Sequence, residues 1–393
     1  MSNDVLQVAA HQALANVIDP EIRRPITELG MVDQLEVDET GTVHLTVLLT
    51  VASCPLRNTI ESDVRKALGS VEGITGINLT IGAMNAEQRS ALTQTLRGGR
   101  PEPVIPFAQP GNLTQVLSIA SGKGGVGKSS ITVNLALALA KMGRSVGLLD
   151  ADIYGHSVPD LLGMAEDVRP TLVDAMIMPV PVEFEAADGT RAVLKVISMG
   201  MLKESRDQVI AWRGPILDRA LTQLLSEVYW GDLDFFLIDL PPGTGDVAMS
   251  VGQKLPGSDL IVVTTPQPSA AWVSERAGTM GSMMHQNVIG VIENMSWYET
   301  ECPHCGKPHR VELFGSGGGQ QTADGLTDRL AREVPLLAQI PMELAMGAGS
   351  EFTAPIVISQ PALPAAQAIT GLAERLVAAR PSLVGKPLNL LAR

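Results

Sequence analysis

The 393-residue sequence predicts an α/β fold: a mostly parallel β-sheet covered by helices on both faces, preceded by a small α+β domain. Short, uniformly apolar runs such as DFFLID and DLIVVTT predict strands that are buried on both faces, as in a parallel sheet. Segments long enough for helices separate these runs, and this alternation is typical of α/β domains. Residues 97–112, RGGRPEPVIPFAQPGN, are dense in glycine and proline and predict a linker between the two domains.

Residues 1–96 are predicted to form the small α+β domain. Apolar residues recur at helical spacing in VLQVAAHQALANVI and in TIESDVRKALGSV, so each is predicted to be an amphipathic helix. TVHLTVLLTV alternates between apolar and polar residues and is a predicted strand, and ITGINLTIG is a second one.

Residues 113–380 are predicted to form the larger domain, and residues 381–393 a C-terminal tail. SSITVNLALALAKMG predicts a helix that ends at Gly143. The predicted strands of this domain are TQVLSIAS, RSVGLLDAD, DFFLIDLPP, DLIVVTTP, NVIGVIENM and VPLLAQIP.

Composition and charge argue against several classes of protein. The formal net charge is −13 and aromatic residues make up 3% of the chain, so we expect no nucleic-acid partner. The N-terminus does not resemble a signal peptide, and no run of about 18 apolar residues occurs, so we expect no membrane partner. Three cysteines do not suit a disulfide framework and predict a reducing, cytoplasmic location.

Residues 122–129, GKGGVGKS, match the phosphate-binding pattern G-x-x-x-x-G-K-[ST] between a predicted strand and a predicted helix. Glycines let backbone N–H groups approach phosphates closely, and the helix N-terminus adds a positive dipole end. Lys128 is expected to reach the β- and γ-phosphates of ATP, and Ser129 to ligate Mg²⁺. The residues of this segment predicted to bind the nucleotide are Gly122, Lys123, Gly124, Gly125, Val126, Gly127, Lys128, Ser129 and Ser130.

Carboxylates follow two of the predicted strands, where they can hold a metal ion or orient water. LLDAD ends one strand with Asp150 and Asp152, and FLIDLPPGTGD ends another with Asp239. Asp239 is predicted to complete the Mg²⁺ shell with Ser129, because an acidic residue at the end of a strand beside the phosphate loop is the Walker B arrangement. Asp150 is expected to have a structural role or a place in the Mg²⁺ shell.

The phosphate loop carries a second lysine, Lys123, and in this it resembles the deviant Walker A motif of the ParA/MinD class of P-loop ATPases. The resemblance implies a P-loop NTPase fold and a nucleotide-sandwich homodimer, in which Lys123 reaches the partner's nucleotide. It also implies that Asp152 positions the attacking water, so the expected catalytic residues of this slow ATPase are Lys123, Lys128 and Asp152. Asn294, at the end of a late strand, would pair with the edge of adenine.

The stretch ECPHCGKPHR holds Cys302 and Cys305, a C-x2-C pair that is half of a four-ligand metal site. Two such pairs, brought together in a dimer, would suit an iron–sulfur cluster. Zinc could instead use His309, with His304 or water as the fourth ligand. A redox pair is disfavoured, because reactive pairs begin a helix and the glycine and proline that follow here oppose one. Cys54, the third cysteine, is either a transient ligand or a small buried residue.

Several longer stretches resemble the Mrp/ApbC family of iron–sulfur cluster carrier ATPases. They include DADIYGHSVPDLLG, WRGPILDRALTQLL, WGDLDFFLIDLPPGTGD and FGSGGG, and the resemblance covers roughly residues 114–378. It implies a [4Fe–4S] cluster that two copies of Cys302 and Cys305 hold across the homodimer, taken from cluster donors and passed to apo iron–sulfur proteins. IDPEIRRPITELGMV and LTVASCPLRNTIESDV resemble the MIP18-like domain that often precedes the ATPase in bacterial members. His156 stands where the family usually has proline.

Two other functions remain open. A spatial-organising ATPase of the ParA/MinD kind would share the fold and the loop, and would bind membrane or DNA through a basic amphipathic C-terminal helix or a basic face. Residues 369–393 have some amphipathic character, but Pro381 and Pro387 interrupt it, and such a protein has no use for the cysteine pair. In the other alternative the ATPase is the same and the cysteines hold a structural zinc ion.

Overall fold

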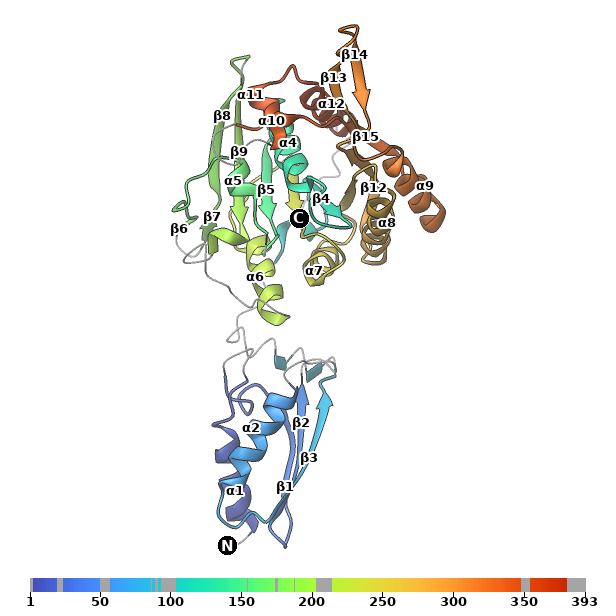
Figure 1. The fold of residues 1–393 in the computed structure, drawn as a ribbon. Helices are drawn as coiled ribbons and strands as arrows, with labels where there is room; N and C mark the ends of the chain where they lie inside the picture. Colours follow the sequence, from blue (N-terminus) through green and yellow to red (C-terminus); the bar gives the residue numbers. More distant parts are fainter. Residues whose placement is uncertain are drawn as a thin grey trace. The chain divides into compact units, whose positions relative to one another are not determined.

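The computed structural model describes residues 3–19, 24–49, 57–85, 87–88, 91–92, 104–153, 155–173, 176–186, 188–202, 214–347 and 354–379. It divides the chain into two compact units, Met1–Glu102 and Pro103–Arg393, and each is described by itself. Figure 1 shows the elements of both units in chain order. Cys54 and the predicted tail, residues 381–393, lie outside the described residues.

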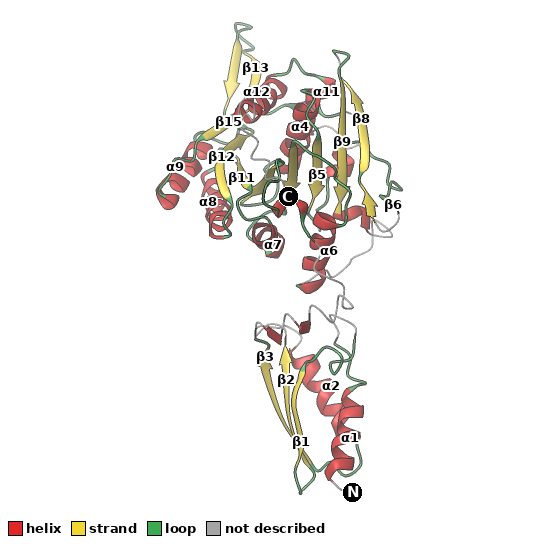
Figure 2. Ribbon diagram, turned by 180° about the vertical axis from the view of Figure 1, so that it is seen from behind, coloured by secondary structure: helices red, strands yellow, loops and turns green. Residues whose placement is uncertain are grey.

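The first unit is a three-stranded sheet with two helices packed on one side of it (Figure 2). The strand order is β1-β2-β3, with β1 antiparallel and β3 parallel to β2. The two predicted helices and two predicted strands are confirmed, although the first helix ends earlier than predicted and Ile18 instead bridges Pro25. The bounds are α1 (Asn3–Leu14), β1 (Val32–Val37), β2 (Thr42–Leu49), α2 (Arg57–Gly69) and β3 (Gly76–Ala83).

The second unit contains an eight-stranded sheet in the order β15-β12-β11-β4-β10-β5-β9-β8. Its strands run parallel, except that β8 at the edge is antiparallel to β9. Its elements are η1 (Pro106–Ala108), β4 (Gln115–Ser121), α4 (Lys128–Lys141), β5 (Val146–Asp150), α5 (Val158–Leu161), β6 (Thr171–Val173), β7 (Met176–Met178), β8 (Val180–Glu185), β9 (Arg191–Ser198), η2 (Met199–Leu202), α6 (Pro215–Ser226), β10 (Phe235–Asp239), α7 (Asp246–Lys254), β11 (Asp259–Thr264), α8 (Pro268–Met283), β12 (Asn287–Asn294), β13 (Tyr298–Glu301), β14 (Pro308–Val311), α9 (Gly318–Leu330), β15 (Leu336–Ile340), α10 (Leu344–Gly347), α11 (Ile356–Ser359) and α12 (Pro364–Ala379).

Helices cover both faces of this sheet, as predicted, because its central strands are apolar on both sides. On one face, residues such as Leu117 and Leu237 pack against α4 and α12. On the other face, residues such as Ile238 and Val262 pack against α6, α7, α8 and α9. Parallel strands place their carboxyl ends at one edge, and the loops that leave this edge carry the predicted site residues. Among the described helices, none is both long and apolar enough to cross a lipid bilayer.

Part of the predicted linker lies against the second unit. Phe107, in η1, stacks on Phe236 of β10 with ring centroids 4.3 Å apart. Ile105 packs against the same core cluster. Two apolar side chains in a proline-rich segment therefore hold residues 104–108 onto the larger unit, and the boundary between the units falls before Pro103.

Candidate functional site

The phosphate loop joins β4 to α4. Gly125 and Gly127 adopt left-handed backbone angles, with φ of 81° and 79°. A side chain at Gly127 would also collide with the amide of Asn294, so this position needs glycine for two reasons. A pocket of about 250 Å³ is lined by the loop together with Asp152, Gly155, Ser157 and Pro242. The first turn of α4 thus borders a pocket made of backbone N–H groups and polar side chains.

Beneath the loop, the carboxylate of Asp239 contacts three side chains from the start of α4. Its carboxylate is fully buried at the end of β10, where Ser129 Oγ donates to its Oδ2 at 2.5 Å. Lys128 Nζ lies 2.7 Å from Oδ1, and Thr132 Oγ1 lies 2.7 Å from the same oxygen. The structure therefore brings Lys128, Ser129 and Asp239 into direct contact. Hydroxyl and carboxylate oxygens are hard donors of the kind that Mg²⁺ prefers, so the set fits this ion.

Asp150, on the neighbouring strand β5, pairs in register with Asp239 of β10. Its burial, reinforced by the charge of Asp239, raises the pKa of Asp150 from 3.8 to about 7. Ser198 Oγ donates to Asp150 Oδ2 at 2.9 Å, and the backbone N–H of Asp152 donates to Oδ1 at 3.2 Å. These contacts tie the start of the next loop to the sheet.

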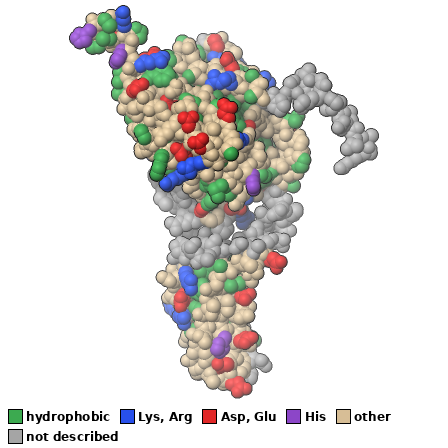
Figure 3. Space-filling model, turned by 90° about the vertical axis from the view of Figure 1, so that its right-hand side faces the viewer, with side chains coloured by type: hydrophobic (Ala, Val, Ile, Leu, Met, Phe, Trp, Pro, Cys, Tyr) green, Lys and Arg blue, Asp and Glu red, His purple; other side chains and the backbone are tan. Residues whose placement is uncertain are grey.

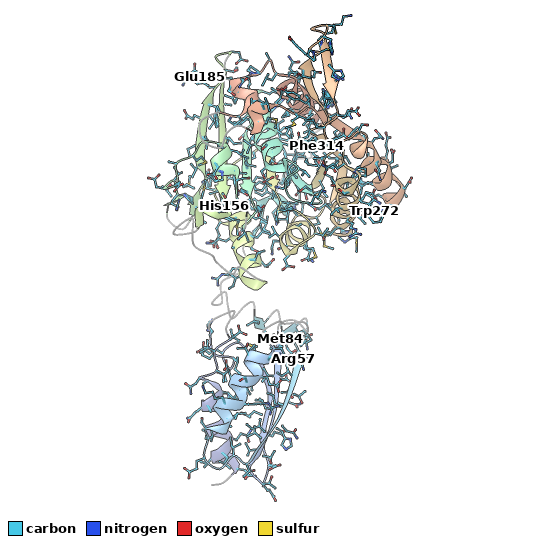
Figure 4. All side chains as sticks on the ribbon, in the orientation of Figure 1. Arg57, Met84, His156, Glu185, Trp272 and Phe314 are labelled. Carbon is cyan, nitrogen blue, oxygen red and sulfur yellow. The ribbon has the colours of Figure 1, made fainter. Side chains whose placement is uncertain are left out.

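The loop after β5 carries Asp152 and His156. Asp152 is 8% exposed, lines the pocket and accepts a hydrogen bond from the backbone N–H of Gly155 at 2.9 Å. His156, labelled in Figure 4, packs against Gly200, where a side chain would collide with the imidazole ring. His156 thus occupies space that only a glycine at this position of η2 leaves open.

Lys123 lines the pocket, and its ammonium group makes a hydrogen bond to a residue of its own chain. Its Nζ donates to Ser269 Oγ, at the start of α8, at 3.1 Å. One turn further along α8, Trp272 (labelled in Figure 4) is 63% exposed. The guanidinium carbon of Arg276 lies 5.8 Å from the centroid of its ring. The serine that holds Lys123 therefore lies one helical turn from an exposed aromatic side chain.

Asn294 lies behind the phosphate loop. It is 3% exposed, and its Nδ2 donates to the carbonyl oxygen of Val126 at 2.9 Å. The residue predicted to meet adenine thus supports the loop in this structure, while its side-chain oxygen remains an acceptor. An acceptor is what the exocyclic amine of adenine requires, so the predicted adenine contact stays a prediction.

The cysteine pair lies in the turn of a hairpin formed by β13 and β14. Gly306, with φ of 65°, donates its backbone N–H to the carbonyl of Cys302 at 2.8 Å, and Cys302 donates to the carbonyl of Lys307 at 2.9 Å. Backbone N–H groups of His304, above all, and of Cys305 point at the Cys302 sulfur and lower the pKa of its thiol. Such a turn, without a helix, favours a thiolate that can bind metal.

The hairpin projects from the second unit (Figures 1 and 3). Cys305 is exposed and Cys302 partly exposed. In the part of the chain that the structure describes, no three His, Cys, Asp or Glu side chains gather in a way that could hold a metal ion. One chain therefore presents two neighbouring thiols on an accessible projection.

Comparison with known proteins identifies the family. The family described as NUBPL iron-transfer P-loop NTPase matches residues 112–377. The chain belongs to this family. A second family, described as iron–sulfur cluster assembly protein, matches residues 7–79, within the first unit.

Two relatives that match most of the length of both chains support this membership. A protein from Mycobacterium leprae named "Iron-sulfur cluster carrier protein" is 46% identical over 385 residues, 98% of this chain and 96% of that one. A protein of the same name from Bacillus subtilis is 38% identical over 333 residues, 83% of this chain and 85% of that one. A solved nucleotide-binding protein from Archaeoglobus fulgidus, in complex with ADP, is 34% identical with a TM-score of 0.47, over 60% of this chain and 85% of that one.

Two residues of this iron-transfer NTPase site were not predicted from the sequence. Thr132 contacts Asp239, and Ser269 holds Lys123. Thr132 follows Ser129 by three residues at the start of a helix, so helical spacing places both hydroxyls on one face and could have identified it. Ser269 lies far from the loop in the sequence, in a segment that carries no motif, and only the fold brings it there.

Proposed function

We propose that this protein is an iron–sulfur cluster carrier whose hold on its cluster is governed by ATP. The observation that carries the proposal is the hairpin turn, in which backbone N–H groups stabilise a thiolate at Cys302 beside an exposed Cys305. The cluster is cargo, so an accessible projection suits its arrival and departure. The family membership and the names of the relatives support the same function.

The ATP site is proposed to hydrolyse ATP with water positioned by Asp152. Lys128 would leave Asp239 to meet the phosphates, and the backbone N–H groups of the loop would surround them. Ser129 and Asp239 would hold Mg²⁺, which when bound neutralises phosphate charge. The protein's contribution is positioning and charge, so slow turnover is expected.

The functional form is proposed to be a homodimer. The hairpin of one chain offers two cysteine ligands, and a [4Fe–4S] cluster takes four. Two hairpins brought together would supply them. Trp272 supports this arrangement, because it is an exposed aromatic side chain one helical turn from the serine that holds Lys123, and aromatic side chains are enriched at protein interfaces. Donors and apo-protein recipients would meet the accessible cluster.

Anaerobic reconstitution with iron and sulfide tests the carrier function. The wild type is expected to bind about four irons per dimer, with visible absorbance. Cys302→Ala/Cys305→Ala is expected to lose this iron while it still binds nucleotide, because the cysteines lie outside the pocket. Iron and zinc content, absorbance and native mass are the measurements. One zinc per chain without an iron chromophore would contradict the carrier function and support a structural zinc site.

Trp272→Ala is expected to weaken nucleotide-dependent self-association roughly 30-fold, the effect of losing a buried aromatic anchor from an interface. Sedimentation velocity with Mg-ATPγS measures it. Met283→Ala is the matched control, since Met283 is 69% exposed at the far end of the same helix. If both variants associate as the wild type does, this face of α8 lies outside the interface.

A further inference from the structure

The last two residues of β12 connect the nucleotide loop to the cysteine hairpin. Glu293 and Asn294 are both buried, at 1% and 3% exposure. Successive residues of a strand point to opposite faces of a sheet. Asn294 accordingly lies on the α4 side and contacts the carbonyl of Val126, while Glu293 lies on the α9 side.

The Glu293 carboxylate holds the segment that leaves the hairpin. Gly319, in the first turn of α9, donates its backbone N–H to Glu293 Oε2 at 2.6 Å. Gln339, on β15, donates its Nε2 to Oε1 at 2.8 Å. A carboxylate at a helix N-terminus is stabilised by the free N–H groups and the dipole there. The packing leaves no room for a side chain at Gly319, where a Cβ would lie 2.5 Å from that of Glu293.

The segment that enters the hairpin starts from the same point. Met295 has a left-handed φ of 57°, so the chain turns sharply after Asn294. Ser296 then donates its N–H to Ile340 at 3.0 Å, and the carbonyl of Trp297 accepts from Met342 at 2.7 Å. Both ends of the hairpin are therefore fixed near the end of β12.

Arg310, on β14, lies with its guanidinium carbon 4.4 Å from the centroid of the Trp297 ring. Its Nε donates to Glu299 of β13 at 3.0 Å. The two strands of the hairpin are thus tied to each other and to the residue that enters it. These contacts join the strands that carry the cysteine turn to the root of the hairpin.

We propose that Glu293 is a positioning residue through which nucleotide in the phosphate loop changes the state of the cysteine hairpin. Nucleotide that moves the Val126 carbonyl moves Asn294, and its neighbour Glu293 passes the shift to Gly319 and the exit of the hairpin. The inference rests on the proposed function for its purpose, the control of a bound cluster. The contacts from which it is argued do not require a cluster.

Alkylation of Cys302 and Cys305 by N-ethylmaleimide, followed for each cysteine by mass spectrometry, tests this in the full-length, metal-free protein. Mg-ADP fills the loop without the γ-phosphate. It is expected to change the wild-type alkylation rates about fivefold or more, the size of a typical coupling between sites. Glu293→Leu is expected to reduce that change to less than about twofold, with Mg-ADP affinity within a few-fold of wild type.

Glu293→Gln keeps an acceptor for the Gly319 N–H and is expected to restore the response to Mg-ADP. Glu275→Leu is the matched control: Glu275, on α8, is also buried, and its carboxylate lies 3.2 Å from Arg329 in the last turn of α9, at the other end of that helix from Gly319. If Glu293→Leu fails to fold, Gln339→Leu, which removes one of the two donors, is expected to weaken the response.

A wild-type protein whose cysteines ignore Mg-ADP, or a Glu293→Leu protein that responds as fully as the wild type, would overturn the inference. The assay contains no iron, so its outcome is separate from that of the reconstitution. If the cysteines respond to Mg-ADP through Glu293 but bind no cluster, the coupling is supported and the carrier function is contradicted. If the cysteines bind a cluster but do not respond to Mg-ADP, the carrier function is supported and the coupling through Glu293 is contradicted.

Discussion

Lys123→Ala is expected to lower the rate of ATP hydrolysis roughly 10³-fold, the effect of removing a cation that a partner supplies to a phosphoryl-transfer site. Binding of ATP to a single chain should change little, because Lys123 is held by Ser269 and the phosphates are met by the rest of the loop. Lys128→Ala is a poorer test, since it would leave Asp239 buried without its cation. Steady-state phosphate release gives the rate.

Mixing two inactive variants shows whether Lys123 acts across the dimer. Asp152 lines the pocket of its own chain, so Asp152→Asn inactivates the site in cis. In a mixed dimer, the site on the Lys123→Ala chain has its own Asp152 and receives Lys123 from the partner. An equal mixture should recover about a quarter of the wild-type rate, because half of the dimers are mixed and each has one active site.

The mixture would stay inactive if Lys123 acted within its own chain, since each chain would then lack one group. Lys141→Ala is the control for a lost lysine. Lys141 lies at the opposite end of α4, in an ion pair with Asp188 at 2.7 Å, and its loss is expected to leave hydrolysis unchanged.

The central strands of the sheet were predictable because burial on both faces leaves a simple pattern. All six predicted strands, from β4 to β15, are present. The strands β1, β6 to β9, β13 and β14 were not identified, and exposure does not explain the omission of β9, which lies inside the sheet between β5 and β8. Along β8 half-buried and exposed residues alternate, and β1 in the first unit is similarly exposed. Strands at a sheet edge bury little surface, so their composition carries a weak signal.

Within the site, the residues that belong to a motif could be predicted from the sequence, because the spacing of a motif fixes the relative positions of its residues. The contact of Ser129 with Asp239 follows from the strand order of a P-loop fold. Contacts between distant segments could not be predicted in this way. Asn294 reaches Val126 across 168 residues of sequence, and Glu293 meets Gly319 only because β12 and α9 pack together. Their positions depend on tertiary packing, which no local pattern encodes.

Asp150→Asn is expected to remove a pH dependence from the stability of the nucleotide-free protein. Burial, and then the charge of Asp239, raises the pKa of Asp150 to about 7. Between pH 4 and 7 the folded state therefore holds a proton that the unfolded state has lost. The stabilisation is complete below the unfolded pKa of 3.8 and is lost as pH rises through the folded pKa. The free energy of unfolding should fall by roughly 4 kcal/mol over this range.

Urea unfolding of both proteins from pH 4 to 8, without nucleotide or Mg²⁺, measures the difference. Asparagine cannot ionise and keeps one acceptor oxygen, as the protonated carboxyl does, so the variant should gain on the wild type as pH rises. Asp188→Asn is the control with the opposite shift. Lys141 and then Thr190 hold the pKa of the exposed Asp188 well below its usual range, so its contribution should be constant above pH 5. Parallel curves for wild type and Asp150→Asn would mean that Asp150 is ionised throughout, with Lys128 neutralising the two carboxylates together.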